Sequence, residues 1–518
     1  MKTSFLLHLG LFSGALAFPW LHPDARPEDL KRGMEAIKRD PEVVQIIQDL
    51  YTQQQKEKRD FFENREVYEA ASETNEKRAT ASNCLTHPLP DFYPTNITGL
   101  KKFPEAAYPY QDPQPSDQRG PCPGLNTMAN HGYINRNGIT TVAQTLVAAA
   151  RVFNMGADLS AFLAGGSVLF AGDIPSMTYS IGGADARTNS LGVVGGSLGT
   201  ETGLSGHLRF KEGDASGTRC DFYLCNGDNH NLNSSVFLDL QSAAKTYGGG
   251  QYNVPALTQH FAHQYTKSRN NNPYFYFFPP QAALVVGATY FIAGFFSNGT
   301  IGAGGVANEA SIASFTGAYF NSSTGTVTYQ PEQIPPQGWY RRGYPMFLSE
   351  GIDGIITLYT GAAATLGQPL LFGANTGTPG AFTGSFSLAQ FGGSGSYGGT
   401  TVNGVACAIE EAVYGNFVSE FGAILNIGAA TLGALETPFA EFTCPVPSGA
   451  PAVEADAPTY PGYPKPQPCK LNPRQNGFAQ CAPDTNTYGR FNTEMVPFCL
   501  NSPTVASPAG NPYPVPLE

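Results

Sequence analysis

Charged side chains are scarce in this sequence, and basic ones are the scarcer kind. Asp, Glu, Lys and Arg make up 14% of the 518 residues, and 41 acidic against 30 basic side chains leave a formal net charge of −11. Nucleic acids and anionic membranes are bound through clusters of Lys and Arg. We therefore expect neither a nucleic acid nor a membrane as a partner.

Long apolar segments are absent after the first residues of the chain. The apolar run Phe5–Leu16 follows Lys2 and ends in small residues up to Ala17. A positive start, a short apolar run and a small-residue cleavage site are typical of a secretory signal peptide. The run is shorter than a membrane-spanning helix. We interpret residues 1–17 as a signal peptide and predict a secreted, soluble, extracellular protein.

Cysteine is infrequent and odd in number. The chain has nine cysteines, and an extracellular, oxidising environment favours disulfides. An odd number leaves at least one thiol that no cysteine of the same chain can pair with. Sequons for N-glycosylation, which suit a glycosylated surface, occur at Asn96, Asn233, Asn298 and Asn321.

The N-terminal part of the chain differs in composition from the rest. Residues 18–78 are charged and favour helix, with a helix start at Asp40-Pro41-Glu42. Dibasic pairs at 58–59 and 77–78 are the kind of sequence after which secretory processing proteases cut. We interpret residues 18–78 as a propeptide-like region. A charged helix that stays attached is the alternative.

We assign residues 79–445 to one catalytic domain and residues 446–518 to a proline-rich tail stapled by disulfides. No internal repeat of fixed period is visible. Apolar residues spaced by three and four predict a helix over residues 138–164. Two further helices are expected over 236–247 and 281–295, the last opened by two prolines.

The C-terminal half of this domain has a different texture. Residues 361–405 are rich in Gly, Ser and Thr, which predicts an insertion of loops or short strands and no helix. Helical texture returns over residues 406–444. The expected fold class is mostly α, a single helical domain with long irregular Gly- and Pro-rich segments toward the C-terminus.

One cysteine lies between two prolines at the start of an expected helix. Pro121 and Pro123 stiffen the chain around Cys122, and Pro123 suits the first helical position. The amides and dipole at a helix start lower the pKa of a thiol and favour the thiolate. A thiolate that binds haem iron favours O–O cleavage. A disulfide cysteine beside two turn prolines is the alternative.

A second motif, Glu-Gly-Asp-Ala-Ser over residues 212–216, is suited to a hard cation. The Glu212 carboxylate, the Gly213 carbonyl and the Ser216 hydroxyl can face one ion, and Gly213 lets its carbonyl approach closely. Mg²⁺ prefers octahedral oxygen ligands, and a haem propionate could supply another. An ordinary surface turn is the alternative.

The two motifs together resemble those of the fungal haem-thiolate peroxidases, the family of chloroperoxidase and unspecific peroxygenase. The segment 119–138, RGPCPGLNTMANHGYINRNG, is similar to the proximal segment of that family. The Glu-Gly-Asp form of the second motif is that of the peroxygenase branch. The resemblance spans roughly residues 84–345 and returns near 407–444.

The resemblance implies a secreted haem-thiolate peroxidase or peroxygenase. It would oxidise a small organic substrate with hydrogen peroxide, secondary metabolism being one setting, and carry haem b and Mg²⁺. Cys122 would be the axial ligand of the haem iron. Glu212, the carbonyl of Gly213 and Ser216 would hold Mg²⁺ with a haem propionate.

The resemblance also bears on the disulfides. Cys407 and Cys444 match the C-terminal disulfide of the family. Cys220 and Cys225 have no counterpart in the family pattern, and we expect a short local bridge between them.

This sequence departs from the family on the distal side of the haem. Peroxygenases carry on one helix an arginine and, seven residues later, a glutamate that shuttles the peroxide proton. The same register here has Gln281 and Ala288. Seven residues are close to two helical turns, so both positions face the haem. Alanine cannot move a proton, which leaves Gln281 as the candidate catalytic residue.

Three consequences of this loss stay open. The chain could bind haem without peroxide chemistry, or use another oxidant or catalyse a rearrangement or coupling. Alternatively, another acid–base residue substitutes, and the sequence candidates are His260, His263 and Glu309.

The aromatic residues around the expected channel are also fewer. Lys211 and Ala283 stand at two positions where the family has aromatics, whereas Phe291 is retained. Fewer rings predict a roomier, more polar channel that suits a bulky substrate.

Overall fold

The fold is that of a computed structural model, which describes most of the chain between residues 101 and 409. The described residues are 42–63, 101–173, 176–188, 203–205, 207, 213–225, 227–277, 279–299, 305–321, 323–324, 326–375, 377–388, 401–409, 442, 469–471 and 479–481. The expected signal peptide therefore lies outside them, as do Asn96, Lys211, Glu212 and Cys444.

The described part is mostly α-helical, as the sequence predicts. Its helices are α2 (Glu42–Glu63), α4 (Pro123–His131), α5 (Val142–Phe153), α6 (Ala157–Ala171), α7 (Ser234–Tyr247), α8 (Val254–Asn271), α9 (Pro279–Phe296), α10 (Glu309–Thr316) and α11 (Leu348–Leu366), with a short 3₁₀ helix, η2 (Ala186–Thr188). The helices expected over 236–247 and 281–295 are confirmed as α7 and α9. None of the described helices is both long and apolar enough to cross a membrane.

The strands are short and pair in small antiparallel sheets. They are β1 (Lys102–Phe103) with β7 (Trp339–Tyr340), β2 (Ile139–Thr141) with β3 (Thr178–Ser180), β5 (Ala318–Asn321) with β6 (Thr326–Tyr329), β10 (Cys469–Leu471) with β11 (Ala479–Cys481), and a three-stranded sheet of β4 (Tyr276–Phe277), β8 (Leu371–Asn375) and β9 (Phe382–Ser387). Cys469 and Cys481 are register partners in the tail.

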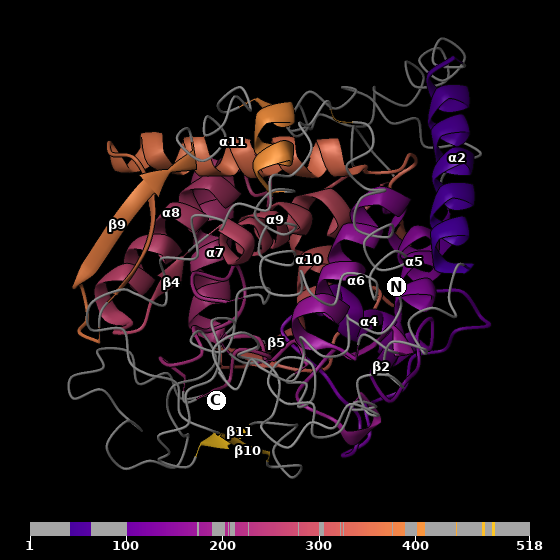
Figure 1. Cartoon of the computed structure of the whole chain (residues 1–518), viewed down its shortest axis with the longest axis horizontal. Helices are drawn as coiled ribbons and strands as arrows, with labels where there is room; N and C mark the ends of the chain where they lie inside the picture. Colours follow the sequence, from indigo (N-terminus) through magenta and orange to yellow (C-terminus); the bar gives the residue numbers. More distant parts are fainter. Residues whose placement is uncertain are drawn as a thin grey trace, which may run out of the picture.

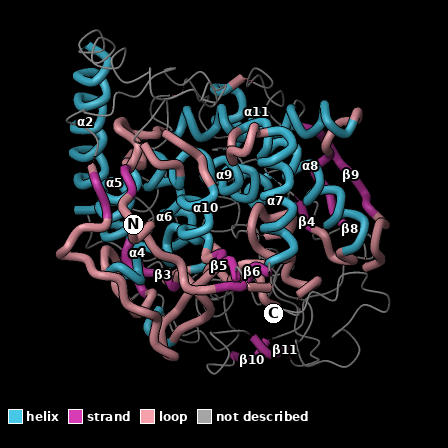
Figure 2. The backbone as a smooth tube through the Cα atoms, turned by 180° about the vertical axis from the view of Figure 1, so that it is seen from behind, coloured by secondary structure: helices cyan, strands magenta, loops and turns pink. Residues whose placement is uncertain are grey.

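Helix α9 runs through the middle of the helical assembly (Figure 1). It contains no charged residue, and Val286, Tyr290 and Ala293 on it are fully buried. A helix that is apolar all round is stable only when neighbours cover it. α8, α10 and α11 pack against α9, while α5 and α6 pack against each other. Figure 2 shows the same arrangement from behind, with α11 along one edge.

The single helix predicted over residues 138–164 is wrong, because the chain breaks into α5 and α6. Asn154 follows α5 with φ of 55°, a left-handed conformation that asparagine tolerates better than most residues. Its Nδ2 donates to the carbonyl of Arg342 at 3.1 Å. The spacing of apolar residues continues through the break, so periodicity alone does not reveal it. After the break, α6 is a separate helix from α5.

The absence of helix predicted for residues 361–405 is wrong at both ends of that range. α11 extends to Leu366 and ends at Gly367, whose φ of 64° is left-handed. The Gly-Ala-Ala-Ala-Thr-Leu segment before it is dominated by alanine, the strongest helix former. The predicted short strands are confirmed as β8 and β9, and residues 402–409 are helical. The rest of the expected helical stretch 406–444 lies outside the described residues apart from Phe442.

Helix α2 comes from the propeptide-like region and packs against α5 and α6 at one edge of the molecule (Figure 1). Ile47 is fully buried there. The side chain of Gln54 donates to the carbonyl of Met155 at 2.8 Å and accepts from the amide of Ala157 at 2.7 Å. Ala157 is the first residue of α6, so Gln54 satisfies one of the amides that a helix start leaves unpaired.

Replacing Gln54 by leucine is expected to lower the free energy of unfolding by about 1–3 kcal/mol, because a buried amide and a partly buried carbonyl lose their partner. Urea unfolding measures this change. Gln48→Leu on the exposed face of α2 is the matched control and should change little. Equal stability of the two variants would show that α2 contributes nothing through this contact.

Candidate active site

Cys122 occupies the position that the sequence predicts for a thiolate. It is the residue immediately before α4, in extended conformation with φ of −79° and ψ of 108°, and Pro123 is the first helical residue. It is partly buried and is a thiol, outside the disulfides of the described chain. The amides at the start of α4 favour the anionic form of the sulfur.

Cys122 lines a large pocket whose described lining is mostly apolar, so the prediction of a more polar channel is wrong for this part of the chain. The walls come from α4, α5, α6, α9 and α11, with Ile409 at one side, and the space between them, including the part open to solvent, is about 1130 Å³. None of the described lining residues is Asp, Glu, His, Lys or Arg. A pocket of this size suits a cofactor and a ligand together, but its described lining offers no carboxylate or imidazole for proton transfer.

Two hydroxyl groups form a pair in this pocket. Tyr179 and Thr145 are hydrogen-bonded at 2.8 Å, and Thr145 also donates to the carbonyl of Thr141 at 3.0 Å. Burial raises the pKa of Tyr179 well above its usual range, although its bond to Thr145 acts in the opposite direction. The phenol therefore stays protonated and neutral, and the pocket stays free of a tyrosinate.

The loop that carries Cys122 is held by Asn126 on α4. Its side chain accepts from the amide of Gly120 at 2.9 Å and donates to the carbonyl of Gly120 at 2.8 Å. Gly120 has no room for a side chain, since a Cβ there would lie 1.7 Å from the carbonyl oxygen of Ile181. The chain before Cys122 is thus held at Gly120 by the Asn126 side chain and by the close backbone of Ile181.

A buried ion pair supports the same loop from the other side. The Arg219 guanidinium donates to the carbonyl of Pro121 at 3.1 Å and to the Glu332 carboxylate at 2.5 Å. Both charged side chains are at most 1% exposed. Glu332 also accepts from Asn126 at 3.0 Å and from the Tyr329 hydroxyl at 3.1 Å. Glu332 therefore joins α4 to the segment after the second motif.

Sequence reasoning missed this role of Glu332. Arg219 follows the Glu-Gly-Asp motif closely, but Glu332 is in no motif and lies 206 residues from Asn126. Its carbonyl additionally accepts from Asn130 at 2.8 Å. A carboxylate in a proline-rich loop gives no local signal that it will be fully buried.

Gln281 and Ala288, the two positions of α9 that differ from the family, lie in surroundings that differ from each other. Ala288 lines the pocket, as do Ala283 and Phe291. Gln281 is buried but is not among the lining residues. In the amide orientation that satisfies both neighbours, it donates to the carbonyl of Tyr276 at 2.7 Å and accepts from the amide of Asp214 at 3.1 Å. The expected catalytic role of Gln281 stays a prediction, and its amide is engaged by backbone.

The second motif is described from Gly213 onward. The Ser216 hydroxyl accepts from the amide of Arg219 at 3.2 Å. The Asp214 carboxylate bonds with its Oδ2 to the His207 ring at 2.9 Å. The other oxygen of Asp214 is buried without a hydrogen-bond partner in the described part of the chain. No cluster of three or more His, Cys, Asp or Glu suited to a metal occurs among the described residues, and Glu212 is not one of these.

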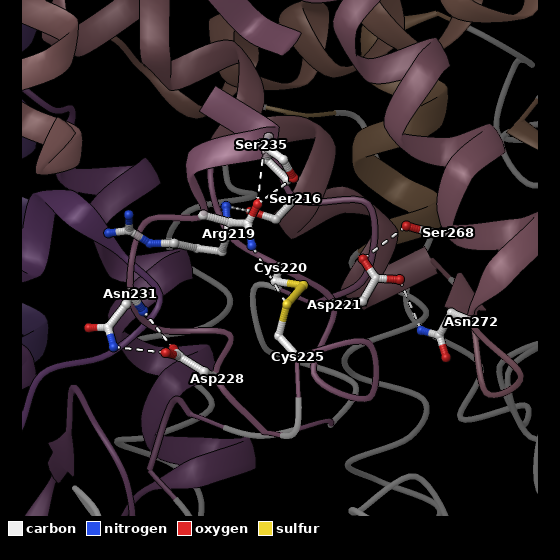
Figure 3. The surroundings of a disulfide bond; sticks show 12 residues. Ser216, Arg219, Cys220, Asp221, Cys225, Asp228, Asn231, Ser235, Ser268 and Asn272 are labelled. Carbon is white, nitrogen blue, oxygen red and sulfur yellow. Dashed lines mark hydrogen bonds between the residues drawn. A yellow bond between two sulfur atoms is a disulfide. The ribbon is translucent and has the colours of Figure 1, made fainter. Parts of the chain in front are cut away.

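The segment after this motif is anchored to α8 by Asp221 (Figure 3). One carboxylate oxygen accepts from the Ser268 hydroxyl and the other from the Asn272 amide, both at 2.9 Å. Burial and the nearby Asp214 raise the pKa of Asp221 to about 7. The expected local bridge is confirmed, because Cys220 and Cys225 form a disulfide.

The outcome for the other predicted disulfide is partial. Cys407 is disulfide-bonded. Cys444, the partner that the family pattern assigns, lies outside the described residues.

The three alternative acid–base residues lie outside the pocket wall. His260 and His263 both contact the Asp239 carboxylate, at 2.6 Å and 2.5 Å. Burial alone would raise the pKa of Asp239, but the contacts with both imidazoles lower it to about 2. Glu309 accepts from Gln241 at 2.5 Å. These contacts are structural, and none brings a proton donor to the pocket.

Comparison with known proteins decides the family. Residues 108–344 match the family model described as Peroxidase, family 2. The dothistromin biosynthesis peroxidase of Dothistroma septosporum is 33% identical over 351 residues, which cover 66% of this chain and 81% of that protein. The chain belongs to the fungal haem-thiolate peroxidases.

Other relatives support the same assignment. An aromatic peroxygenase of Coprinellus radians is 36% identical over 208 residues, 40% of this chain and 77% of that protein. An aromatic peroxidase of Fusarium equiseti is 33% identical over 272 residues, 52% of this chain and 60% of that protein. The protein is thus a haem-thiolate peroxidase, and membership implies a haem.

The residues present fit a haem bound through sulfur. The Cys122 thiol stands at the start of α4 and opens onto an apolar pocket whose walls come from five helices. A flat, largely apolar macrocycle requires such walls, and a thiolate is one of the axial ligands that haem iron takes. Gly124 adds room beside the sulfur, since a Cβ there would meet Phe153 and the Cys122 Sγ, the latter at 3.9 Å.

Proposed function

We propose that this haem-thiolate peroxidase uses hydrogen peroxide to oxidise a small aromatic substrate, with haem b held by Cys122. The observation that carries the proposal is the Cys122 thiol at a helix start in the wall of a large apolar pocket. When bound, the haem supplies the peroxide-activating chemistry that thiolate ligation favours.

The chain's own residues bind and position the substrate and exclude water. Leu284, Phe291 and Ile352 belong to the apolar part of the wall that α9 and α11 supply. The ion pair of Arg219 and Glu332 keeps the Cys122 loop in place. Ala288 is the wall residue where the family has an acid, so the described lining supplies no carboxylate for proton transfer during peroxide activation.

The substrate class is supported by the relatives. One is named for dothistromin biosynthesis and two others for aromatic compounds. An aromatic compound of secondary metabolism matches a pocket lined mainly by apolar side chains. The alternative is a haem-binding protein with lost or altered peroxide chemistry, which Ala288 in the pocket wall favours.

We further propose that Mg²⁺ is held by Glu212, the carbonyl of Gly213 and Ser216, beside a haem propionate. Hard oxygen ligands of this kind suit Mg²⁺. The buried, unpartnered oxygen of Asp214 in the described chain marks a polar site in the same motif.

The test of haem-thiolate ligation is the carbon monoxide difference spectrum of the reduced protein. The wild-type chain should show a Soret band shifted strongly to the red, because sulfur is the axial ligand. Cys122→Ser should lose that shift and the peroxide-dependent oxidation of 2-naphthol, whereas Cys407→Ser should keep the shift. A wild-type spectrum without it overturns the proposal. The shift without turnover supports the haem-binding alternative.

We propose an extracellular location, which makes the sequons testable. Asn233 is fully buried and its Oδ1 accepts from the amide of Val236 at 3.1 Å at the start of α7. A glycan cannot attach there in the folded protein, so the expectation of a surface sequon is wrong at Asn233. Asn321 ends β5 at the hairpin and is partly exposed. Glycopeptide mapping of the secreted protein should find a glycan on Asn321 and an unmodified Asn233, and the reverse pattern would contradict both expectations.

A further inference from the structure

Ser160 is a buried hydroxyl in the wall of the pocket. It lies in the first turn of α6, is 1% exposed and lines the pocket together with Leu159 and Leu163. Its Oγ has no hydrogen-bond partner within the part of the chain that the structure describes. A buried hydroxyl without a hydrogen-bond partner lowers the stability of the fold. Its presence in the pocket wall therefore indicates that a bound group supplies the missing hydrogen bond.

Two hydroxyls on helices that line the pocket bond to the carbonyl one turn earlier. Ser167, on the same face of α6 two turns later, donates to Leu163 at 2.8 Å. Thr289 on α9 donates to Val285 at 2.9 Å. The carbonyl one turn before Ser160 belongs to Gly156, and it accepts from the backbone amide of Ser160 at 2.9 Å. The Ser160 hydroxyl does not use this common local bond.

The surroundings of Ser160 determine what can complete it. The neighbouring wall residues on α6 and α11 are apolar, among them Leu159, Leu163 and Leu348. Charged groups are absent from the described pocket lining. A ligand that contacts Ser160 is therefore neutral and mostly apolar at this point, with an oxygen that can accept or donate a hydrogen bond.

We propose that Ser160 is a specificity-determining residue that hydrogen-bonds a phenolic hydroxyl or a carbonyl oxygen of an aromatic substrate. This inference rests on the proposed function, since it takes the pocket as the substrate site. A pocket that leaves a buried polar group unpaired discriminates against the analogue that lacks the matching oxygen. The Ser160 hydroxyl thus selects oxygenated ring systems over plain hydrocarbons of the same shape.

The test compares 2-naphthol with naphthalene, which differ by one hydroxyl. Dissociation constants for both are measured by equilibrium dialysis with the haem-loaded full chain and no peroxide. Ser160→Ala should weaken binding of 2-naphthol about fivefold, the worth of one net hydrogen bond, and leave naphthalene binding unchanged or tighter. Ser167→Ala is the matched control, because that hydroxyl is already bonded to Leu163, and it should leave the ratio of the two constants at its wild-type value.

Every result of this comparison decides the proposal. An unchanged ratio in Ser160→Ala, or equal effects of both substitutions, overturns it, as does a wild-type chain that binds neither probe. The binding measurement contains no peroxide, so it does not depend on turnover. If Ser160→Ala changes the ratio of the two dissociation constants but the protein does not oxidise 2-naphthol with peroxide, only the proposed oxidation chemistry is overturned. Near-UV circular dichroism of both variants checks that the packing around α6 is kept.

Discussion

Replacing Ala288 by glutamate is expected to raise the rate of peroxide-dependent oxidation about a hundred- to ten-thousandfold, the usual worth of a positioned general acid–base group. Ala288 lines the pocket from α9 on the wall that also contains Gly287 and Phe291. A carboxylate there would reach the space that the described lining leaves without any carboxylate or imidazole. Steady-state oxidation of 2-naphthol with hydrogen peroxide measures the gain.

Ala288→Gln is the control, because the glutamine side chain has the shape of glutamate but cannot exchange a proton at neutral pH. It should leave the rate at the wild-type level. Burial in an apolar pocket raises the pKa of a carboxyl above its usual value of about 4.3. The gain in Ala288→Glu therefore depends on the ionised form and should appear as pH rises through that raised pKa. If Ala288→Glu and Ala288→Gln oxidise 2-naphthol at equal rates, a carboxylate at position 288 does not assist the reaction.

Replacing Glu332 by alanine is expected to lower the free energy of unfolding by about 3–5 kcal/mol, because it leaves the charge of Arg219 buried and unpaired. Both side chains are at most 1% exposed. The same change removes an acceptor of Asn126, which holds the chain before Cys122. We expect the loss of stability in urea unfolding to be accompanied by faster loss of haem on dilution.

The control for this variant is an ion pair at the surface. Arg187→Ala breaks the pair with Asp185 at 2.7 Å, in which the arginine side chain is 43% exposed. Such a pair contributes about 0–1 kcal/mol. If Glu332→Ala were no less stable than Arg187→Ala, the buried pair would not support the Cys122 loop.

The features that the sequence predicts correctly are local ones. A proline on each side of Cys122 places it at a helix start, and this is its position before α4. α7 and α9 are found because their apolar spacing and their first residues carry enough information. The short spacing between Cys220 and Cys225 likewise favours a local bridge. In each case residues within one or two turns of each other determine the result.

The wrong predictions concern places where distant residues decide. The left-handed Asn154 ends α5, and the carbonyl of Arg342 holds its side chain. Asn233 is a sequon in the sequence and a buried helix cap in the fold. Residues of the propeptide-like region pack as α2 against α6, with Gln54 bonded to its first amide, a contact that the sequence does not reveal, whereas the removal of this region stays a prediction. Periodicity and motif spacing contain no information on such contacts.

The sequence by itself determined the kind of chemistry: a thiol whose anion is favoured by a helix start, and no acid at Ala288. The tertiary structure alone decided which groups meet. It paired Arg219 with Glu332 behind the Cys122 loop and brought the hydroxyl of Ser160 to the pocket wall. The reason is physical. Conformational preferences act between neighbouring residues, whereas the burial of a charge or a hydroxyl depends on how helices far apart in the chain pack together.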